Sequence, residues 1–271
     1  MNRARNAARG MLVVLVATLT HAPAHSAPAR PGQTLRVFAA ASLADAFGEI
    51  ARLFERDHAG TTVQLNLAGS QQLAVQLEQG AAADVFAAAD EHWMTYAREH
   101  SIVSGEATVF ARNRLVAIVP RTNPARIGSL QDLSRRGVKL VIGAQAVPVG
   151  RYSRDVLQNL SRTDGFPSDF ASRVIANVVS EEENVKSVVG KVQLGEADAG
   201  MVYRSDVTPA LSRYVRVFEI PDSANVLTAY PIALTTDSRL PESARAFVDL
   251  VLSQTGQGIL ERRGLIPVRR P

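Results

Sequence analysis

Hydrophobic and polar positions follow two rhythms along this chain. Short apolar or alternating runs predict strands, whereas apolar residues spaced three and four apart predict helices. The segment after Ser42 has the helical spacing, with Leu43, Phe47, Ile50 and Phe54 on one stripe. The predicted strands cover residues 35–40, 62–67, 84–89, 114–119, 139–142, 174–179, 200–203, 215–220 and 232–234. The predicted helices begin near residues 43, 71, 93, 151, 185, 244 and 259.

This alternation of strands and helices predicts an α/β fold, with mostly parallel sheets flanked by helices. The strands are too many for one doubly wound sheet of this length, which favours two smaller lobes. No long glycine-serine linker separates them, so we expect the lobes to be joined by two crossover segments. The expected division places residues 30–112 and 229–271 in lobe 1 and residues 113–228 in lobe 2.

The first residues have the features of a secretory signal peptide. Three arginines precede an apolar run at residues 11–19, which is too short to span a bilayer as a helix, and small residues and prolines follow. We therefore expect residues 1–27 to be removed and the mature protein to act in the periplasm. The sequence has no cysteine, which excludes disulfides, thiol catalysis and a lipid anchor on an N-terminal cysteine.

The net charge is much smaller once the residues of this leader are left out. The whole chain carries 30 Lys and Arg against 26 Asp and Glu, a net charge of +4. The leader holds three of the basic residues and no acidic one, which leaves 27 against 26 in the mature chain. The remaining arginine pairs are scattered. We expect no binding to nucleic acid, because that requires a clustered basic face.

Motifs of the common enzyme classes are absent from the sequence. No HxH, HExxH, Walker, GxGxxG or GxSxG pattern occurs, so we expect no enzyme activity and no resident cofactor. A secreted serine hydrolase using Ser42 or Ser70 is a remote alternative, because neither serine lies beside a base in a recognised motif. We interpret Asp90 as the cap of a helix and Trp93 as a core residue.

Strand-to-helix turns carry the candidate chemistry. Ser42, followed by Asp45, and Ser70 stand where strands end and helices begin, which is the pattern of helix caps. Further helices begin after residues 148–150 and 181–184. A helix N-terminus at the carboxyl end of a strand offers free backbone N–H groups to an anion. The pattern leaves two interpretations open, plain caps or a small-anion site.

Several segments, taken in order, resemble the periplasmic molybdate-binding proteins of ABC transporters. They are VFAAASL at 37–43, AGSQQLA at 68–74, QGAAADVF at 79–86, ADEHWMTY at 89–96, VPVGRY at 147–152, ENVK at 183–186, GMVYRSD at 200–206 and LERRGLI at 260–266. No single motif is specific, but the ordered set is. The resemblance spans residues 34–267 and implies the type II periplasmic-binding-protein fold, in which two lobes close on a ligand in the cleft between them.

The resemblance also implies the ligand and its contacts. The ligand would be molybdate, and also tungstate, held by neutral hydrogen bonds and delivered to an inner-membrane ABC permease by a monomeric protein. Carried over position by position, the oxyanion contacts fall on the hydroxyl and N–H groups of Ser42 and Ser70, the backbone N–H groups of Val149 and Val185, and the Tyr203 hydroxyl.

Two departures from the family pattern bear on the pocket, and an alternative ligand stays open. A bulkier Val149 replaces the family's small residue, and Asn184 replaces an aspartate. Three acidic residues at 181–183 lie close to the proposed donor at Val185, where we expect them to complement the helix dipole and face away from the ligand. The alternative within the same class is a binding protein for another small oxyanion, such as sulfate.

Overall fold

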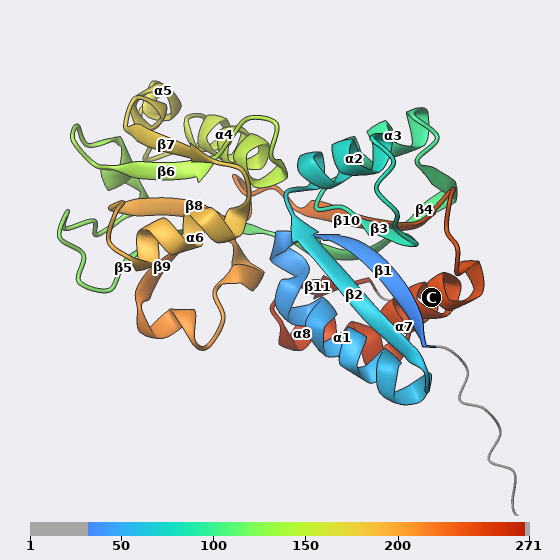
Figure 1. Cartoon of the computed structure of the whole chain (residues 1–271). Coiled ribbons are helices and arrows are strands. Elements are labelled where there is room, and N and C mark those ends of the chain that lie inside the picture. Colours follow the sequence, from blue (N-terminus) through green and yellow to red (C-terminus); the bar gives the residue numbers. More distant parts are fainter. Residues whose placement is uncertain (1–31, 269–271) are drawn as a thin grey trace, which may run out of the picture. The chain divides into compact units, whose positions relative to one another are not determined.

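Two β-sheets organise the part of the chain that the computed structural model describes, residues 32–268 (Figure 1). The first sheet, in the strand order β11-β4-β10-β3-β1-β2, contains β1 (Gln33–Ala40), β2 (Thr61–Ala68), β3 (Val85–Ala87), β4 (Val103–Asn113), β10 (Thr228–Thr235) and β11 (Ile266–Pro267). The second, in the order β7-β6-β8-β5-β9, contains β5 (Leu115–Pro120), β6 (Leu140–Gly143), β7 (Val178–Glu182), β8 (Ala199–Tyr203) and β9 (Val215–Glu219). The predicted leader, residues 1–27, lies outside the described residues.

Helices cover both sheets, and each sheet with its helices forms one lobe (Figure 1). Lobe 1 holds α1 (Ala44–Asp57), α2 (Ser70–Glu78), α3 (Glu91–Glu99), α7 (Pro241–Leu252) and α8 (Gln254–Arg262). Lobe 2 holds α4 (Pro148–Leu160), α5 (Phe170–Ile175) and α6 (Val185–Gln193). Short 3₁₀ helices complete the elements within residues 32–268: η1 (Ala41–Leu43), η2 (Leu130–Ser134), η3 (Arg204–Asp206) and η4 (Leu211–Arg213). The predicted two-lobed α/β architecture is confirmed.

Each sheet is mixed. β1 is parallel to β2 and β3, and β6 is parallel to β7 and β8, as strand-helix-strand units require. β10 is antiparallel to β3 and β4, and β5 is antiparallel to β8 and β9. β4 ends at Asn113 and β5 begins at Leu115, so the chain passes straight from one sheet into the other. The expectation of mostly parallel sheets therefore holds for the strand-helix-strand units and not for the strands at the junction.

The apolar stripe predicted after Ser42 is the buried face of α1. Phe47, Ile50 and Phe54 are fully buried. The rings of Phe47 and Phe54 lie edge-on to Phe247 of α7, with centroids 5.9 and 5.5 Å apart. Burial of each such side chain contributes about 1.5–3 kcal/mol, so this contact fixes α1, and the η1 turn that precedes it, against lobe 1.

Two stretches differ from the sequence prediction. No strand is predicted at 103–113, where β4 lies, because most positions in its first half are exposed and show no apolar pattern. Residues 174–179 are predicted as a strand, and this is wrong at its start, where α5 ends before β7 begins. A helix of six residues is too short to show the helical spacing of apolar positions.

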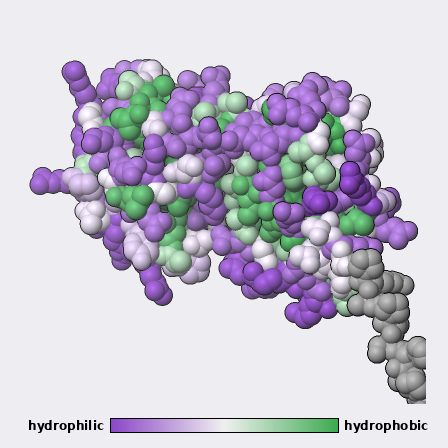
Figure 2. Space-filling model, viewed as in Figure 1, coloured by the Kyte–Doolittle hydropathy of each residue, from purple (hydrophilic) through white to green (hydrophobic). Residues whose placement is uncertain are grey.

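The described surface is mostly hydrophilic on the side drawn in Figure 2, where hydrophobic residues form separate patches. The apolar side chains gather instead inside each lobe, around the sheets. Among residues 32–268, no helix is both long and apolar enough to cross a membrane.

A close approach at Gly150 sets the position of α4. A Cβ atom at residue 150 would overlap the carbonyl oxygens of Gly143 and Ala144, at the end of β6. The first turn of α4 therefore rests directly on the backbone of the second sheet.

We expect Gly150→Ala to destabilise the protein by about 1–3 kcal/mol, the usual cost of forced overlap in a packed interior. Gly190→Ala is the matched control, because a Cβ at this helical glycine of α6 meets open space. The control should leave the melting temperature unchanged or raise it, since alanine favours helix by about 1 kcal/mol over glycine. Thermal unfolding of both variants checks this, and equal melting temperatures would contradict it.

Candidate functional site

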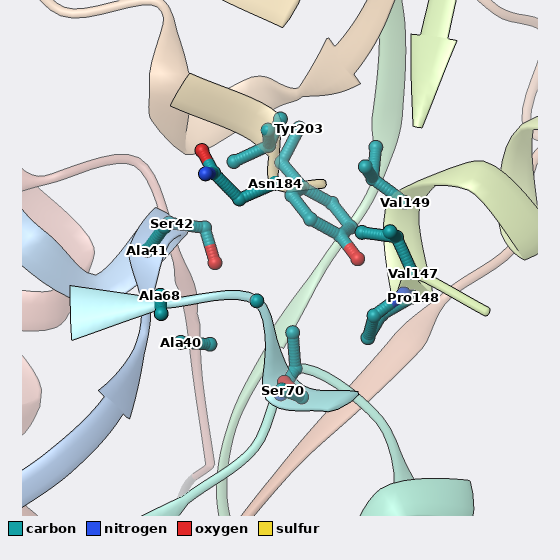
Figure 3. Close-up of a pocket in the computed structure, with 13 residues that line it drawn as sticks. Ala40, Ala41, Ser42, Ala68, Ser70, Val147, Pro148, Val149, Asn184 and Tyr203 are labelled. Carbon is teal, nitrogen blue, oxygen red and sulfur yellow. The ribbon is translucent and has the colours of Figure 1, made fainter. Parts of the chain in front are cut away.

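A small cavity lies where the two lobes meet (Figure 3). Its volume is about 20 Å³, and a single water needs about 10–15 Å³ by this measure. It is lined by Ala40, Ala41, Ser42, Ala68, Gly69, Ser70, Ala89, Val147, Pro148, Val149, Asn184, Val185 and Tyr203. All five residues predicted as ligand contacts are in this set. A space of this size suits a ligand of a few atoms.

Three helix N-termini converge on the cavity. α2 begins at Ser70, α4 at Pro148 and α6 at Val185. The first N–H groups of a helix have no acceptor within it, and the helix dipole places partial positive charge there. Proline has no N–H, so Val149 carries the first donor of α4. The N–H groups of Ser70, Val149 and Val185 thus belong to first helical turns that border one cavity.

Ser42 does not cap α1, so the capping interpretation is wrong at this position. It lies within η1, one residue before the Leu43 cap of α1, which makes no side-chain cap bond. The Ser42 Oγ instead lies 3.0 Å from the hydroxyl of Tyr230 on β10. The side chain is buried, and its oxygen points toward the middle of the cavity (Figure 3).

Ser70 does not cap its helix either. Gly69 occupies the cap position of α2, and Ser70 is the first helical residue. The Ser70 Oγ accepts a hydrogen bond from the Ala89 N–H at 3.0 Å. Accepting this bond leaves the hydroxyl hydrogen available for another acceptor. Asp90 and Asn184, by contrast, do cap α3 and α6, accepting from the N–H groups of Trp93 and Ser187. The prediction for Asp90 is confirmed.

Tyr203 brings an unpaired hydroxyl into the cavity. The residue is only 1% exposed, and its Oη has no hydrogen-bond partner among residues 32–268. Its ring projects from the end of β8 into the space between Ser42 and Pro148 (Figure 3). Burial raises the pKa of Tyr203 well above its usual value, so the phenol keeps its proton. A buried donor without an acceptor costs about 1–3 kcal/mol, which an oxyanion in the cavity would recover.

The cavity lining holds donors and apolar groups, and within the described chain none of its residues is charged. The acidic residues at 181–183 lie outside this lining and are paired elsewhere. Glu181 contacts Arg154 at 2.6 Å and Glu182 contacts Lys191 at 2.9 Å. Glu183 accepts from Gln72 at 2.8 Å. These carboxylates therefore do not line the cavity, as the sequence interpretation expects.

Three contacts between residues outside the cavity lining join the two lobes. The Asp90 side chain, 0% exposed, pairs with Arg151 of α4 at 2.7 Å. The Trp93 indole donates to the Ala146 carbonyl at 2.8 Å. The Gln71 amide donates to the Glu183 carbonyl at 2.7 Å. Trp93 is half-buried: its ring packs against the apolar cluster of lobe 1, as the prediction of core packing expects, and its indole N–H also bridges to lobe 2. No sequence motif marks these pairs, because each partner lies far away along the chain.

Neither cavity serine has the neighbours that hydrolysis needs. Among residues 32–268, the hydrogen-bond partners of Ser42 and Ser70 are Tyr230 and the Ala89 N–H, and no histidine or carboxylate contacts either hydroxyl. A serine nucleophile requires an adjacent base.

The fold and the cavity define a two-lobed binding protein. The chain belongs to the family of bacterial extracellular solute-binding proteins, whose pattern matches residues 35–266. It is therefore a solute-binding protein and not an enzyme. The molybdate-binding protein ModA of Mycobacterium tuberculosis is 39% identical over 94% of each chain.

Solved structures agree with this assignment. The substrate-binding domain of a molybdenum ABC transporter from Clostridium difficile is 28% identical, with a TM-score of 0.64 over 88% of this chain and 100% of that one. The sulfate-binding protein SubI of M. tuberculosis has a TM-score of 0.77 at 15% identity, over 87% of each chain. At such low identity the likeness to SubI shows the fold alone.

We expect Tyr203 to remain protonated, and able to donate, at pH values well above 10. Burial holds its pKa well above the usual value for tyrosine, so it should not add to the phenolate absorbance that appears between about pH 9 and 11. Titrations of the folded parent and of folded Tyr203→Phe should therefore coincide in this range. In urea the two proteins should differ by one phenolate, which is the control. A smaller signal from the folded variant would contradict the expectation.

Proposed function

We propose that this protein captures molybdate, and also tungstate, in the periplasm and delivers the anion to an ABC permease of the inner membrane. Relatives that carry the molybdate-binding name match the chain over nearly its whole length, which supports the choice of ligand. The observation that carries the proposal is the buried hydroxyl of Tyr203, which has no partner within residues 32–268 and faces the cavity. The proposed contacts are Ser42, Ser70, Val149, Val185 and Tyr203.

The chemistry of these groups favours a fully ionised oxyanion. Hydroxyl and N–H groups donate to oxygen, and three helix dipoles add partial positive charge without a cation in the lining. A ligand oxygen that still carries a proton would meet another donor. A ring of donors spaced for long metal–oxygen bonds stretches the hydrogen bonds to the smaller sulfate, and each buried donor left unpaired costs about 1–3 kcal/mol.

The proposed ligand contacts come from both lobes, which supports capture of the ligand by closure of the lobes. Ser42 and Ser70 belong to lobe 1, whereas Val149, Val185 and Tyr203 belong to lobe 2. One anion can therefore bond to both lobes and favour the arrangement in which they are closed. We propose lobe boundaries at residues 30–112 with 229–271 and at 113–228, and a monomer exported by a leader at residues 1–27.

Calorimetry of the mature protein with four oxyanions tests the ligand. We expect tight binding of molybdate and tungstate, weaker binding of sulfate and the weakest binding of phosphate, which carries a proton at neutral pH. Equal affinity for sulfate and molybdate would favour the sulfate alternative, and no heat with any oxyanion would overturn the function. Ser70→Ala and Tyr203→Phe should each weaken molybdate binding by about tenfold or more, the effect of about 1.4 kcal/mol. Tyr214→Phe, at an exposed position, is the matched control.

The Asp90–Arg151 ion pair joins the lobes outside the cavity lining and should contribute to affinity without touching the ligand. Arg151→Met leaves the buried Asp90 carboxylate without its cation, so the closed arrangement loses a contact that spans the lobes. We expect about a tenfold loss of molybdate affinity or more, in the range for breaking one buried charge pair at an interface. Arg173→Met is the control, because Arg173 pairs with Asp169 of its own lobe at an exposed site. Calorimetry compares them, and equal affinities would refute the role of the pair.

A further inference from the structure

A chain of four buried side chains runs from the junction of the lobes to the cavity. The Asn113 Nδ2 donates to the Ser205 Oγ at 2.8 Å and to the Tyr230 hydroxyl at 3.3 Å. The Tyr230 hydroxyl in turn lies 3.0 Å from the Ser42 Oγ. Asn113 is the last residue of β4, at the passage between the sheets, and Tyr230 lies on the neighbouring strand β10. All four residues are at most 6% exposed.

Asn113 fixes the direction of the two hydrogen bonds that it makes in this chain. Its Oδ1 accepts from the Arg114 N–H at 3.0 Å, which places the amide nitrogen toward Tyr230. An amide nitrogen only donates, so the Tyr230 oxygen accepts from it. We assign the Tyr230 hydrogen to the Ser42 Oγ, because this oxygen is the one acceptor among residues 32–268 within hydrogen-bond distance of the Tyr230 hydroxyl. Burial raises the pKa of Tyr230, which keeps that hydrogen in place.

Ser42 therefore cannot give its own hydrogen to Tyr230, because two hydrogens would meet between the oxygens. Its hydrogen has to find an acceptor elsewhere, and the cavity is the open side of the residue (Figure 3). Ser42 could receive a proton from a ligand only by leaving its own hydrogen unpaired, at the cost of an unmade hydrogen bond.

We propose that Asn113 and Tyr230 are positioning residues that hold the Ser42 hydroxyl as an obligatory donor, so that the site rejects oxyanions that carry a proton. This inference rests on the proposed oxyanion function. It places one determinant of specificity outside the cavity lining, at the junction between the lobes.

Asn113→Asp reverses the chain with almost no change of shape. A carboxylate at 113 can still accept from the Arg114 N–H, and it also accepts from the hydroxyls of Ser205 and Tyr230. Tyr230 then accepts from Ser42, whose lone pairs face the cavity in place of its hydrogen. The variant site would offer an acceptor to a protonated ligand.

The test compares sulfate with phosphate at about pH 8, where both are dianions of similar size and only phosphate carries a proton. The added carboxylate repels both equally, so the ratio of their dissociation constants isolates the proton. We expect Asn113→Asp to shift this ratio toward phosphate by about tenfold or more. In Asn113→Asp/Tyr230→Phe the link to Ser42 is cut and its hydroxyl is free to donate or to accept, so the ratio should lie between those of the parent and the single variant. An unchanged ratio in the single variant, or an equal shift in the double variant, would overturn the inference.

A second test, a double-mutant cycle of Tyr230 and Ser42, introduces no buried carboxylate. It therefore applies even if Asn113→Asp does not fold. Tyr230→Phe should weaken molybdate binding several-fold in the parent and have no effect on top of Ser42→Ala, because it acts through Ser42. Additive losses would overturn the positioning role. Parent protein that binds molybdate while these tests fail refutes only this inference. Parent protein that binds no oxyanion refutes the proposed function, and the inference with it.

Discussion

Buried hydrogen-bond donors need acceptors, and the cavity between the lobes supplies too few. The helices α2, α4 and α6 begin there, and the Tyr203 hydroxyl has no partner among the described residues. We propose that an oxyanion supplies the missing acceptors. The rest of the structure positions these donors. Strands end at the cavity, and glycine at position 150 lets α4 rest on the second sheet. The α1–α7 contact holds η1 in place.

In a site of neutral hydrogen-bond donors, the strength with which anions are attracted and the preference for one anion over another depend on different features. A buried lysine would attract every anion and would be costly to bury when the site is empty. Helix N-termini and hydroxyls attract more weakly, but each has a direction, so the number of satisfied donors depends on the size and protonation of the ligand. In our proposal, Tyr230 extends this control of specificity beyond the cavity lining, because its hydrogen bond to Ser42 sets the direction of the Ser42 hydrogen.

Much of the architecture could be predicted from the sequence, and the reasons differ by residue. Phe47, Ile50 and Phe54 repeat at helical spacing, so α1 is visible in the pattern. The five proposed site residues line one cavity, and resemblance and strand-to-helix turns had indicated the same places. The capping roles of the two serines were wrong, because capping rules assume a local partner. Ser42 contacts Tyr230, 188 residues away, and Ser70 contacts Ala89, 19 residues away.

The contacts that close the cleft were beyond sequence reasoning for the same reason, and their position has a physical consequence. Asp90 with Arg151, and Trp93 with Ala146, join the lobes outside the cavity lining. Because neither pair includes a residue of the cavity lining, we expect its contribution to affinity to be similar for every anion. Substitutions in these two pairs can therefore change the affinity for all ligands together. The donors inside the cavity, and the hydrogen-bond chain behind Ser42, change the ratio between ligands. The residues that join the lobes thus contribute to affinity alone, whereas the cavity donors contribute to both affinity and selectivity.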